Sequence, residues 1–396
     1  MIYYLHPFGK QFRRITPMKK ITGNMVSSNE YFFGELTIEN NIITRVRKIS
    51  APETDADITL PGFIDTHLHG LGEYSAESPE GIRGMAAFAP VCGTTAIVPT
   101  FASEPEKFYT EMLAAVRDMV RTPPPGARIP GCHMEGPFLS HRFKGGMVEE
   151  RLRLPSVELM EKFLDIAQGT LKIVTIAPEL PGAKEVIELL CRNGVVVSAG
   201  HTDCPPELFP ETVSWGISRV CHLFDAWDSP QTKGGVRQAA VTDLALTDDN
   251  VMKELIVDGL HVPPELIRLA RRAAGAEKII AVSDAMQGAG LKSGRFHDCG
   301  EWFIIRDGDV ARRERDNAIV GSSLSMNRAF YNMVTRFGFT IPEASVSLSG
   351  NPARSVGLGE VTGSIAPGFK ADLTCLAPDM LTVKRCFVRG EELYRS

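Results

Sequence analysis

The stretch Pro61–Gly70, PGFIDTHLHG, ends an apolar run with two histidines that are separated by one residue. Side chains alternate between the two faces of a strand, so His67 and His69 are expected on the same face. Two imidazoles on one face at the end of a strand can hold one metal ion from one side. Taken alone this motif is weak, because packed or surface histidines can have the same spacing.

Three further motifs place metal-binding side chains directly after apolar runs. Glu135 lies in IPGCHMEGPFL, His201 in SAGHTD and His222 in VCHLFD. One carboxylate and two imidazoles from three neighbouring strands make a site that stays open to water, as catalytic metals require. His67 and His69 could complete a second site, with Glu135 bridging the two ions. These ligand types favour Zn, Fe or a related divalent transition ion, and one or two ions are expected.

Asp284, in IIAVSDAM, follows another apolar run. A carboxylate there can take a proton from water and return it to a leaving amine. The alternative is that Asp284 caps the next helix. Each metal-ligand candidate, considered singly, could likewise be a hydrogen-bonded group of the core. Their joint placement at strand ends favours catalysis.

A repeating pattern supplies the elements that would bring these residues together. From Pro61 onward, apolar and β-branched runs alternate with segments of helical composition, for example 106–121, 156–167, 183–193 and 263–274. The expected strands are 62–69, 94–101, 129–135, 172–179, 195–201, 219–225, 254–261 and 278–284. Eight buried parallel strands separated by helices predict an α/β protein with a (β/α)8 barrel. The carboxyl ends of such strands meet at one mouth, where the active site lies.

Both ends of the chain are expected to contribute to a small β-sandwich domain beside the barrel. Short strands are predicted at 20–26, 31–39, 42–49, 371–376 and 385–394, with a hairpin turn at Asn40-Asn41. The predicted organisation is an extension over 1–17, a sandwich from 18–60 and 360–396, and a barrel over 61–359. Within the last part of the barrel, 312–316 is expected as a charged, solvated loop and 321–336 as a helix.

The composition is that of an ordinary globular protein, with 396 residues, 43% hydrophobic, 23% charged and a net charge of −5. The chain has no basic field, so nucleic acid is not an expected partner. No apolar run approaches the length of a membrane span, and the first residues do not have the pattern of a signal peptide. Eight scattered cysteines without C-x-x-C are typical of reduced thiols in a cytoplasmic protein.

Nine motifs resemble, in the same order, those of the N-acetylglucosamine-6-phosphate deacetylase family of the amidohydrolase superfamily. They are PGFIDTHLHG, HMEGPF, APE, AGHTD, HLFDA, DGLHV, SDAM, GNPAR and GSIAPGFKADL, and they cover nearly everything from Met18 to Tyr394. The resemblance implies a barrel with a small β-sandwich, a metal-dependent deacetylase of an amino sugar or its phosphate, and a homodimer. It implies Asp284 as the catalytic acid and base, and His261 as the histidine that orients the scissile carbonyl.

The resemblance also assigns the metal ligands. Glu135, His201 and His222 match the family's principal ligands. His67 and His69 match a pair that some members keep for a second ion and others replace.

Four residues are expected to bind the substrate, because they stand at positions that recognise the sugar phosphate in the family. Met147 stands where the family typically has a histidine, and Asp225-Ala226 where it usually has Asn-Ala. Lys233 stands where an arginine helps to bind phosphate. Each change weakens the recognition of an anion, so we expect that the substrate is not the usual 6-phosphate or that its phosphate is held differently.

Two other readings remain open from the residues. One is a different amidohydrolase activity, on a cyclic amide or an N-acyl amino acid. The other is a barrel that binds a metal or a small ligand without turning it over. The presence of Asp284 speaks against a non-catalytic barrel, because a binding module needs no acid or base beside its ligands.

Overall fold

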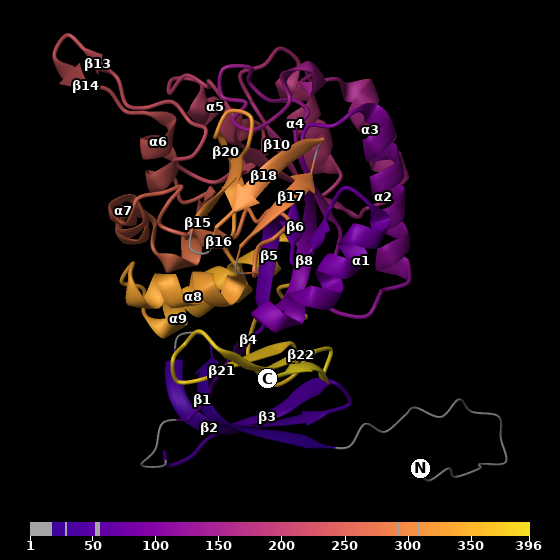
Figure 1. Ribbon diagram of the computed structural model, residues 1–396. Coiled ribbons are helices and arrows are strands. Elements are labelled where there is room, and N and C mark those ends of the chain that lie inside the picture. Colours follow the sequence, from indigo (N-terminus) through magenta and orange to yellow (C-terminus); the bar gives the residue numbers. More distant parts are fainter. Residues whose placement is uncertain (1–17, 28–29, 52–55, 292, 299, 307–308) are drawn as a thin grey trace.

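The computed structural model describes residues 18–27, 30–51, 56–291, 293–298, 300–306 and 309–396. The extension expected over 1–17 lies outside the described residues. Figure 1 shows a barrel with its helices above a smaller β domain, in which strands from the beginning and the end of the described chain lie side by side.

The barrel consists of eight parallel strands that are hydrogen-bonded in chain order. They are β5 Phe63–Leu68, β8 Thr94–Phe101, β9 Cys132–Glu135, β10 Leu171–Ile176, β11 Val196–Ala199, β12 Ile217–Val220, β15 Met252–Ile256 and β16 Ile279–Val282. The ring closes between the ends of β5 and β16, where Asp284 N donates to His67 O at 2.9 Å. The expected (β/α)8 barrel is confirmed.

Helices cover the outside of the barrel and pack apolar faces against the strands. They are α1 Pro79–Phe88, α2 Glu106–Arg121, α3 Val157–Ala167, α4 Ala183–Arg192, α5 Phe209–Trp215, α6 Val241–Thr247, α7 Pro264–Ala274 and α8 Met326–Thr335. On α2 the buried side chains Tyr109, Leu113 and Val116 follow helical spacing. Ser156 caps α3 by accepting from Leu159 N. The four helices expected from composition are therefore confirmed, to within a residue or two at their ends.

Three expected site residues lie just beyond their strands and have left-handed backbone conformations. The φ angles are 49° at His201, 23° at His222 and 48° at Asp284. Residues other than glycine seldom occupy this region, and such strain is held only where the surrounding structure requires it. The strands are shorter than expected because the chain leaves the sheet here.

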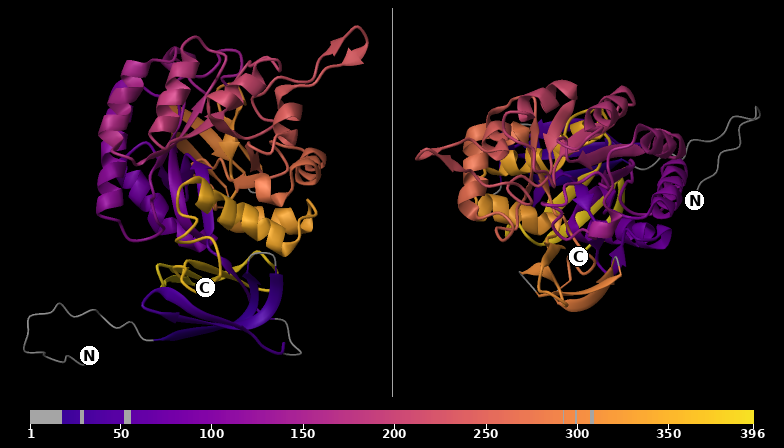
Figure 2. Two further views of the ribbon diagram at one scale, coloured as in Figure 1. Left: turned by 180° about the vertical axis from the view of Figure 1, so that it is seen from behind. Right: turned by 90° about the horizontal axis from the view of Figure 1, so that it is seen from above.

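A four-stranded antiparallel sheet follows the barrel's last strand, and we call it the cap sheet. It consists of β17 Gly294–Asp298, β18 Glu301–Ile305, β19 Val310–Arg313 and β20 Ile319–Ser322. Figure 2 shows it standing at one side of the barrel. The solvated loop expected at 312–316 is wrong for Arg313, whose side chain is buried and paired with Asp316. The helix expected from Gly321 begins only at Met326, because Gly321 pairs with β19.

The β domain is one mixed sheet of seven strands built from both chain ends, in the order β23-β22-β21-β4-β1-β2-β3. The strands are β1 Lys19–Ser27, β2 Glu30–Glu39, β3 Ile42–Lys48, β4 Ile58–Pro61, β21 Leu373–Leu376, β22 Val383–Val388 and β23 Glu391–Arg395. Asn40 and Asn41, with φ of 50° and 67°, form the expected hairpin turn. The short remaining elements are β6 Gly70–Leu71, β7 Tyr74–Ser75, β13 Thr232–Lys233, β14 Val236–Arg237, α9 Ile341–Ser345 and α10 Asn351–Ser355.

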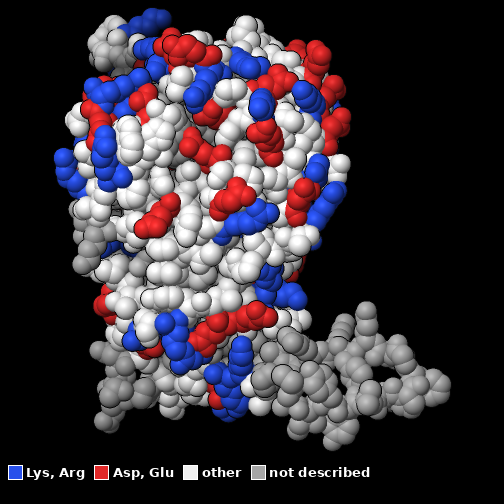
Figure 3. All heavy atoms as spheres, turned by 45° about the vertical axis from the view of Figure 1, so that its right-hand side comes forward, with Lys and Arg blue, Asp and Glu red and all other residues white. Residues whose placement is uncertain are grey.

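The surface carries both signs of charge. In Figure 3 acidic and basic side chains are interspersed over the face shown. Within the described ranges, no helix has the length and apolar character needed to cross a membrane.

A buried ion pair joins the barrel to the β domain. Arg128 donates to both carboxylate oxygens of Asp372, at 2.8 and 3.3 Å, and the side chain of Asp372 is fully buried. Arg128→Ala would leave that charge buried without its partner, which typically costs about 3–5 kcal/mol. We expect a loss of about 3 kcal/mol in urea unfolding. Arg47→Ala, which removes an exposed partner of Glu35, should cost less than about 1 kcal/mol. Equal losses in the two variants would contradict a structural role for the buried pair.

Candidate active site

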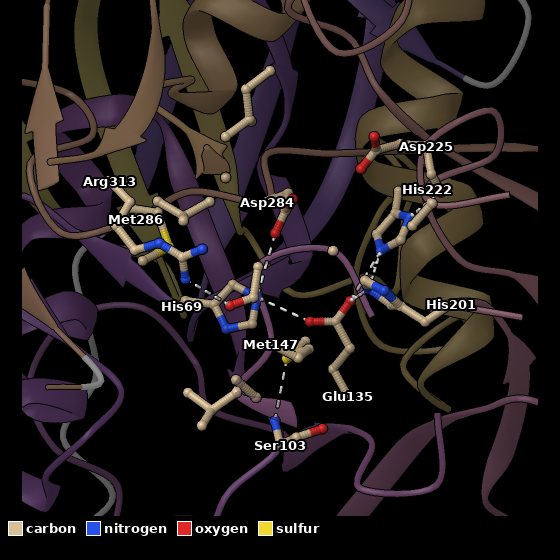
Figure 4. Close-up of a pocket in the computed structure, with 18 of the residues that line it drawn as sticks. His69, Ser103, Glu135, Met147, His201, His222, Asp225, Asp284, Met286 and Arg313 are labelled. Carbon is tan, nitrogen blue, oxygen red and sulfur yellow. Dashed lines mark hydrogen bonds and ion pairs between the residues drawn. The ribbon is translucent and has the colours of Figure 1, made fainter. Parts of the chain in front are cut away.

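Glu135 and two histidines converge at the ends of three barrel strands. Glu135 ends β9, His201 follows β11 and His222 follows β12. Glu135 Oε1 lies 3.1 Å from His201 Nε2 and 3.0 Å from His222 Nε2, and the two Nε2 atoms lie 3.1 Å apart. All three side chains are buried. Figure 4 shows the Glu135 carboxylate between these rings on one side and His69 on the other.

Hydrogen bonds behind the two rings set which nitrogen faces the centre. His201 Nδ1 lies 2.8 Å from Phe143 O, and His222 Nδ1 lies 3.0 Å from Asp225 O. A carbonyl only accepts, so each Nδ1 donates, and in the neutral imidazole each Nε2 then presents a lone pair. Two lone pairs and a carboxylate oxygen within about 3 Å repel one another unless a cation lies between them. The residues therefore fit a divalent metal ion held by two imidazoles and a carboxylate.

The charges at this centre are coupled. Burial works to raise the pKa of Glu135, but the neighbouring His67, His201 and His222 hold it well below its usual value. The pKa of His222 is raised well above its usual value by Cys221 and Glu135, against the effect of burial. Glu135 is thus a carboxylate, ready to bind a cation.

The H-x-H pair lies on the other side of Glu135. His69 Nε2 is 3.2 Å from Glu135 Oε2 and 3.3 Å from Asp284 Oδ1. His67 Nε2 is 3.3 Å from Glu135 Oε1 and 3.4 Å from Asp284 Oδ1. His67, His69 and Glu135 offer ligand atoms that all lie within 4.8 Å of one another. Both histidines thus face the centre, as strand alternation predicts.

Asp284 is fixed at the seam where the barrel closes. Besides its bond to β5, its carbonyl oxygen accepts from Ser322 N at 2.8 Å. Burial works to raise the pKa of Asp284, but the charge of His67 and the hydrogen bond from His69 lower it below its usual value. The carboxylate faces Glu135 across the mouth (Figure 4). The expected alternative, a helix cap, is not observed, because the chain enters the loop before the cap sheet.

A cavity of about 360 Å³ opens above these residues. This volume suits a small molecule. Barrel loops form most of the wall, and Glu301, Phe303, Arg313 and Ile319 of the cap sheet and its loops close one side. Chemistry and substrate would therefore meet between the barrel mouth and the cap sheet.

His261 lines the cavity in a fixed orientation. Its Nδ1 lies 2.6 Å from Asp258 Oδ2, and its Nε2 is buried with no hydrogen-bond partner in the described part of the chain. Burial works to lower the pKa of His261, but the hydrogen bond and charge of Asp258 raise it. Nε2 faces the cavity, and when both ring nitrogens are protonated it can donate to a molecule bound there.

The other substrate-binding candidates divide into two groups. Met147, Asp225 and Ala226 line the cavity together with His261. Met147 Sδ also accepts from Ser103 N at 3.4 Å. Lys233 is absent from the cavity wall formed by the described residues and lies on the exposed β13–β14 hairpin, which projects from the barrel (Figure 1). The role expected for Lys233 stays a prediction.

Three arginines of the cavity wall were not anticipated from the sequence. They are Arg142, Arg151 and Arg313. Arg313 Nη1 also donates to Gly146 O at 3.4 Å, which ties the cap sheet to the loop after β9. Val310–Arg313 reads VARR, two apolar residues followed by two basic ones, so it shows no alternation that could have predicted a buried arginine.

Comparisons with known proteins show which family the chain belongs to. Residues 58–393 match the Amidohydrolase family. The chain is 30% identical to an N-acetylgalactosamine-6-phosphate deacetylase of Escherichia coli O157:H7, over 90% of this chain and 94% of the relative. It is also 30% identical to the N-acetylglucosamine-6-phosphate deacetylase of Bacillus subtilis (strain 168), over 95% of each chain.

Solved structures of similar proteins have the same fold. A variant N-acetyl-D-glucosamine-6-phosphate deacetylase from Mycobacterium smegmatis, in complex with N-acetyl-D-glucosamine-6-phosphate, superposes with a TM-score of 0.87 at 27% identity. That match covers 96% of this chain and 100% of the other. The Thermotoga maritima N-acetylglucosamine-6-phosphate deacetylase superposes with a TM-score of 0.86 at 28% identity, over 96% and 100%. The chain therefore belongs to the amidohydrolase family and, within it, to the N-acetylglucosamine-6-phosphate deacetylase family.

Proposed function

We propose that this protein is a metal-dependent deacetylase that hydrolyses the N-acetyl amide of an amino sugar or amino-sugar phosphate and releases acetate. The observation that carries the proposal is the meeting of Glu135, His201 and His222 ligand atoms opposite Asp284 in one cavity. The substrates in the names of the relatives support the same reaction.

The candidate metal site has two halves, each formed by a different group of ligands. Glu135, His201 and His222 would hold a first divalent transition ion, zinc or iron. His67 and His69, with oxygens shared from Glu135 and Asp284, would hold a second. When bound, such an ion supplies a Lewis acid that polarises a carbonyl and acidifies water.

Asp284 moves the proton. Its lowered pKa keeps it ionised near neutral pH, so it can accept the proton that an attacking water loses. The same proton then passes to the amide nitrogen as the C–N bond breaks, so acetate and a free amine leave and Asp284 is regenerated. His261 Nε2–H donates to the acyl oxygen and orients it.

Two wider expectations belong to this proposal. Every cysteine among the residues that the structure describes is a free thiol, which supports a reducing compartment such as the cytoplasm. The homodimer stays a prediction.

Metal binding can be tested at Glu135. Glu135→Gln keeps the shape of the side chain but removes the charge that both halves of the site share. The loss of metal affinity should exceed the roughly 10–100-fold cost of removing a group that only orients a ligand. Zinc affinity, measured by chelator competition, and acetate release should both fall. Full metal occupancy in this variant would show that the ion lies elsewhere.

The proton transfer can be tested at Asp284. Asp284→Asn should retain the first ion, because His201, His222 and Glu135 remain. General acid–base catalysis commonly contributes about 10²–10⁴ in rate, and one group acts here in both directions, so kcat should fall at least that far. Glu179→Gln is the control, because Glu179 follows β10 outside the cavity and is bound by Thr202 and by Asp203 N. Normal turnover by Asp284→Asn would make Asp284 structural.

The charges inside the cavity bear on whether the part of the substrate away from its acetyl group carries a phosphate. Each arginine of the wall already has an acidic partner: Arg142 with Asp203, Arg151 with Glu104, and Arg313 with Asp316. Asp225 lines the same wall beside His222 (Figure 4). A phosphate a few ångströms from this carboxylate would be repelled by roughly 1–4 kcal/mol at effective dielectrics between about 80 and about 20.

The substrate can be tested by kcat/KM. We expect N-acetylglucosamine 6-phosphate to be a poorer substrate than unphosphorylated or amine-bearing N-acyl analogues. Asp225→Asn should then improve the 6-phosphate about tenfold, which corresponds to ~1.4 kcal/mol, and leave neutral analogues nearly unchanged. Wild-type turnover of the 6-phosphate at about 10⁵ M⁻¹s⁻¹ or above would contradict this specificity. No acetate from any N-acetyl amino sugar, with the metal bound, would contradict the proposed function itself.

A further inference from the structure

A charged pair is buried inside the barrel directly behind the H-x-H motif. Glu254 lies on β15 and Arg219 on the neighbouring β12, and their side chains are 0% and 1% exposed. Arg219 Nη2 donates to Glu254 Oε2 and, at 2.8 Å, to Thr66 Oγ1. Removing two charges from water is expensive, so a buried pair adds little to stability by itself. This pair therefore calls for a functional explanation.

The second oxygen of Glu254 reaches the candidate metal ligands. Glu254 Oε1 lies 2.7 Å from His67 Nδ1 and also accepts from His222 N at 3.2 Å. Arg219 pairs with the other oxygen of Glu254 inside the barrel, so Glu254 is a carboxylate and only accepts. In the neutral ring of His67 the single proton then lies on Nδ1.

The other nitrogen of His67 faces the site. His67 Nε2 is buried and makes no hydrogen bond with any residue that the structure describes. The closest carboxylate oxygens are those of Glu135 and Asp284, at 3.3 and 3.4 Å. An unprotonated nitrogen beside two carboxylate oxygens has the arrangement of ligand atoms around a cation.

We propose that Glu254, held in place by Arg219, is the positioning residue of the second-ion half of the site. By accepting from Nδ1 it fixes the ring and tautomer of His67, with Nε2 directed at Glu135 and Asp284, and it raises the electron density of that nitrogen. Glu254 thereby sets the affinity for a second ion. This inference rests on the metal site of the proposed function.

An ion bound deeper in the barrel is the competing explanation. Cys221 Sγ lies 3.6 Å from His67 Nδ1 and 3.5 Å from Glu254 Oε1, and these groups are close enough to hold a cation. Arg219, however, occupies the other oxygen of Glu254 and places a positive charge beside it. That charge opposes a second cation at this depth, which favours a hydrogen bond between Glu254 and His67.

The test is zinc titration of metal-free protein by chelator competition. Wild type should bind two ions of unequal affinity, and His69→Ala should identify the weaker one by removing it. Glu254→Gln should weaken that ion about 10–100-fold and leave the stronger ion unchanged. Glu179→Gln, which changes a half-buried carboxylate that follows another barrel strand, should leave both unchanged. This selectivity separates positioning from a general loss of stability, which would affect both ions.

A second measurement reads the ring of His67 in the wild-type protein itself. In the zinc-loaded wild type labelled with ¹⁵N-histidine, the ring of His67, assigned by His67→Asn, should carry its proton on Nδ1 and none on Nε2. A proton on Nε2 would overturn the proposal. An unchanged or evenly weakened pair of ions in Glu254→Gln would also overturn it, as would loss of an ion in Cys221→Ser.

Different results would contradict the role of Glu254 and the proposed function. Wild type that binds a single ion and releases acetate would overturn the role of Glu254 and leave the proposed function standing. Wild type that binds no divalent ion would contradict both.

Discussion

The carboxylate of Glu135 is the constraint on which the rest of the site depends. It is buried at the end of β9, where a lone charge would be costly, and imidazoles approach both of its oxygens. Oε1 lies near His201, His222 and His67, and Oε2 near His69. One side chain therefore sets the distance between the two halves. Any shift of one barrel strand against another would break several of these contacts at once.

The closing seam of the barrel places Asp284, the proposed acid and base, opposite that carboxylate. Asp284 N donates to His67 O, and His69 N donates to Ala285 O at 2.8 Å. The backbones approach so closely that a Cβ on Gly70 would lie 2.2 Å from Gln287 N. These contacts fix the position of the chain after β16, the last barrel strand, relative to the H-x-H motif. Asp284 therefore has little freedom to move. The same seam that completes the fold thus assembles the geometry of the proposed site.

Much of this protein was determined by local sequence. Alternation put His67 and His69 on one face, and apolar runs ending in Glu135, His201 and His222 predicted a barrel mouth lined with ligands. The structure brings these side chains together at the mouth, because strand period and helix composition depend on neighbours along the chain and the carboxyl ends of barrel strands meet there. Their role as metal ligands stays a prediction. The turn at Asn40-Asn41 was predicted for the same reason, since asparagine tolerates a positive φ.

Tertiary structure alone decided which buried charges face one another. Glu254 reads as an ordinary strand residue until the barrel places it beside Arg219, 35 positions away, and His67, 187 positions away. Arg313 reads as part of a solvated loop until β19 pairs with β20 and turns its guanidinium toward the cavity. A sequence pattern records whether a residue is polar, but the cost of burying its charge depends on partners that only the fold brings within hydrogen-bonding distance.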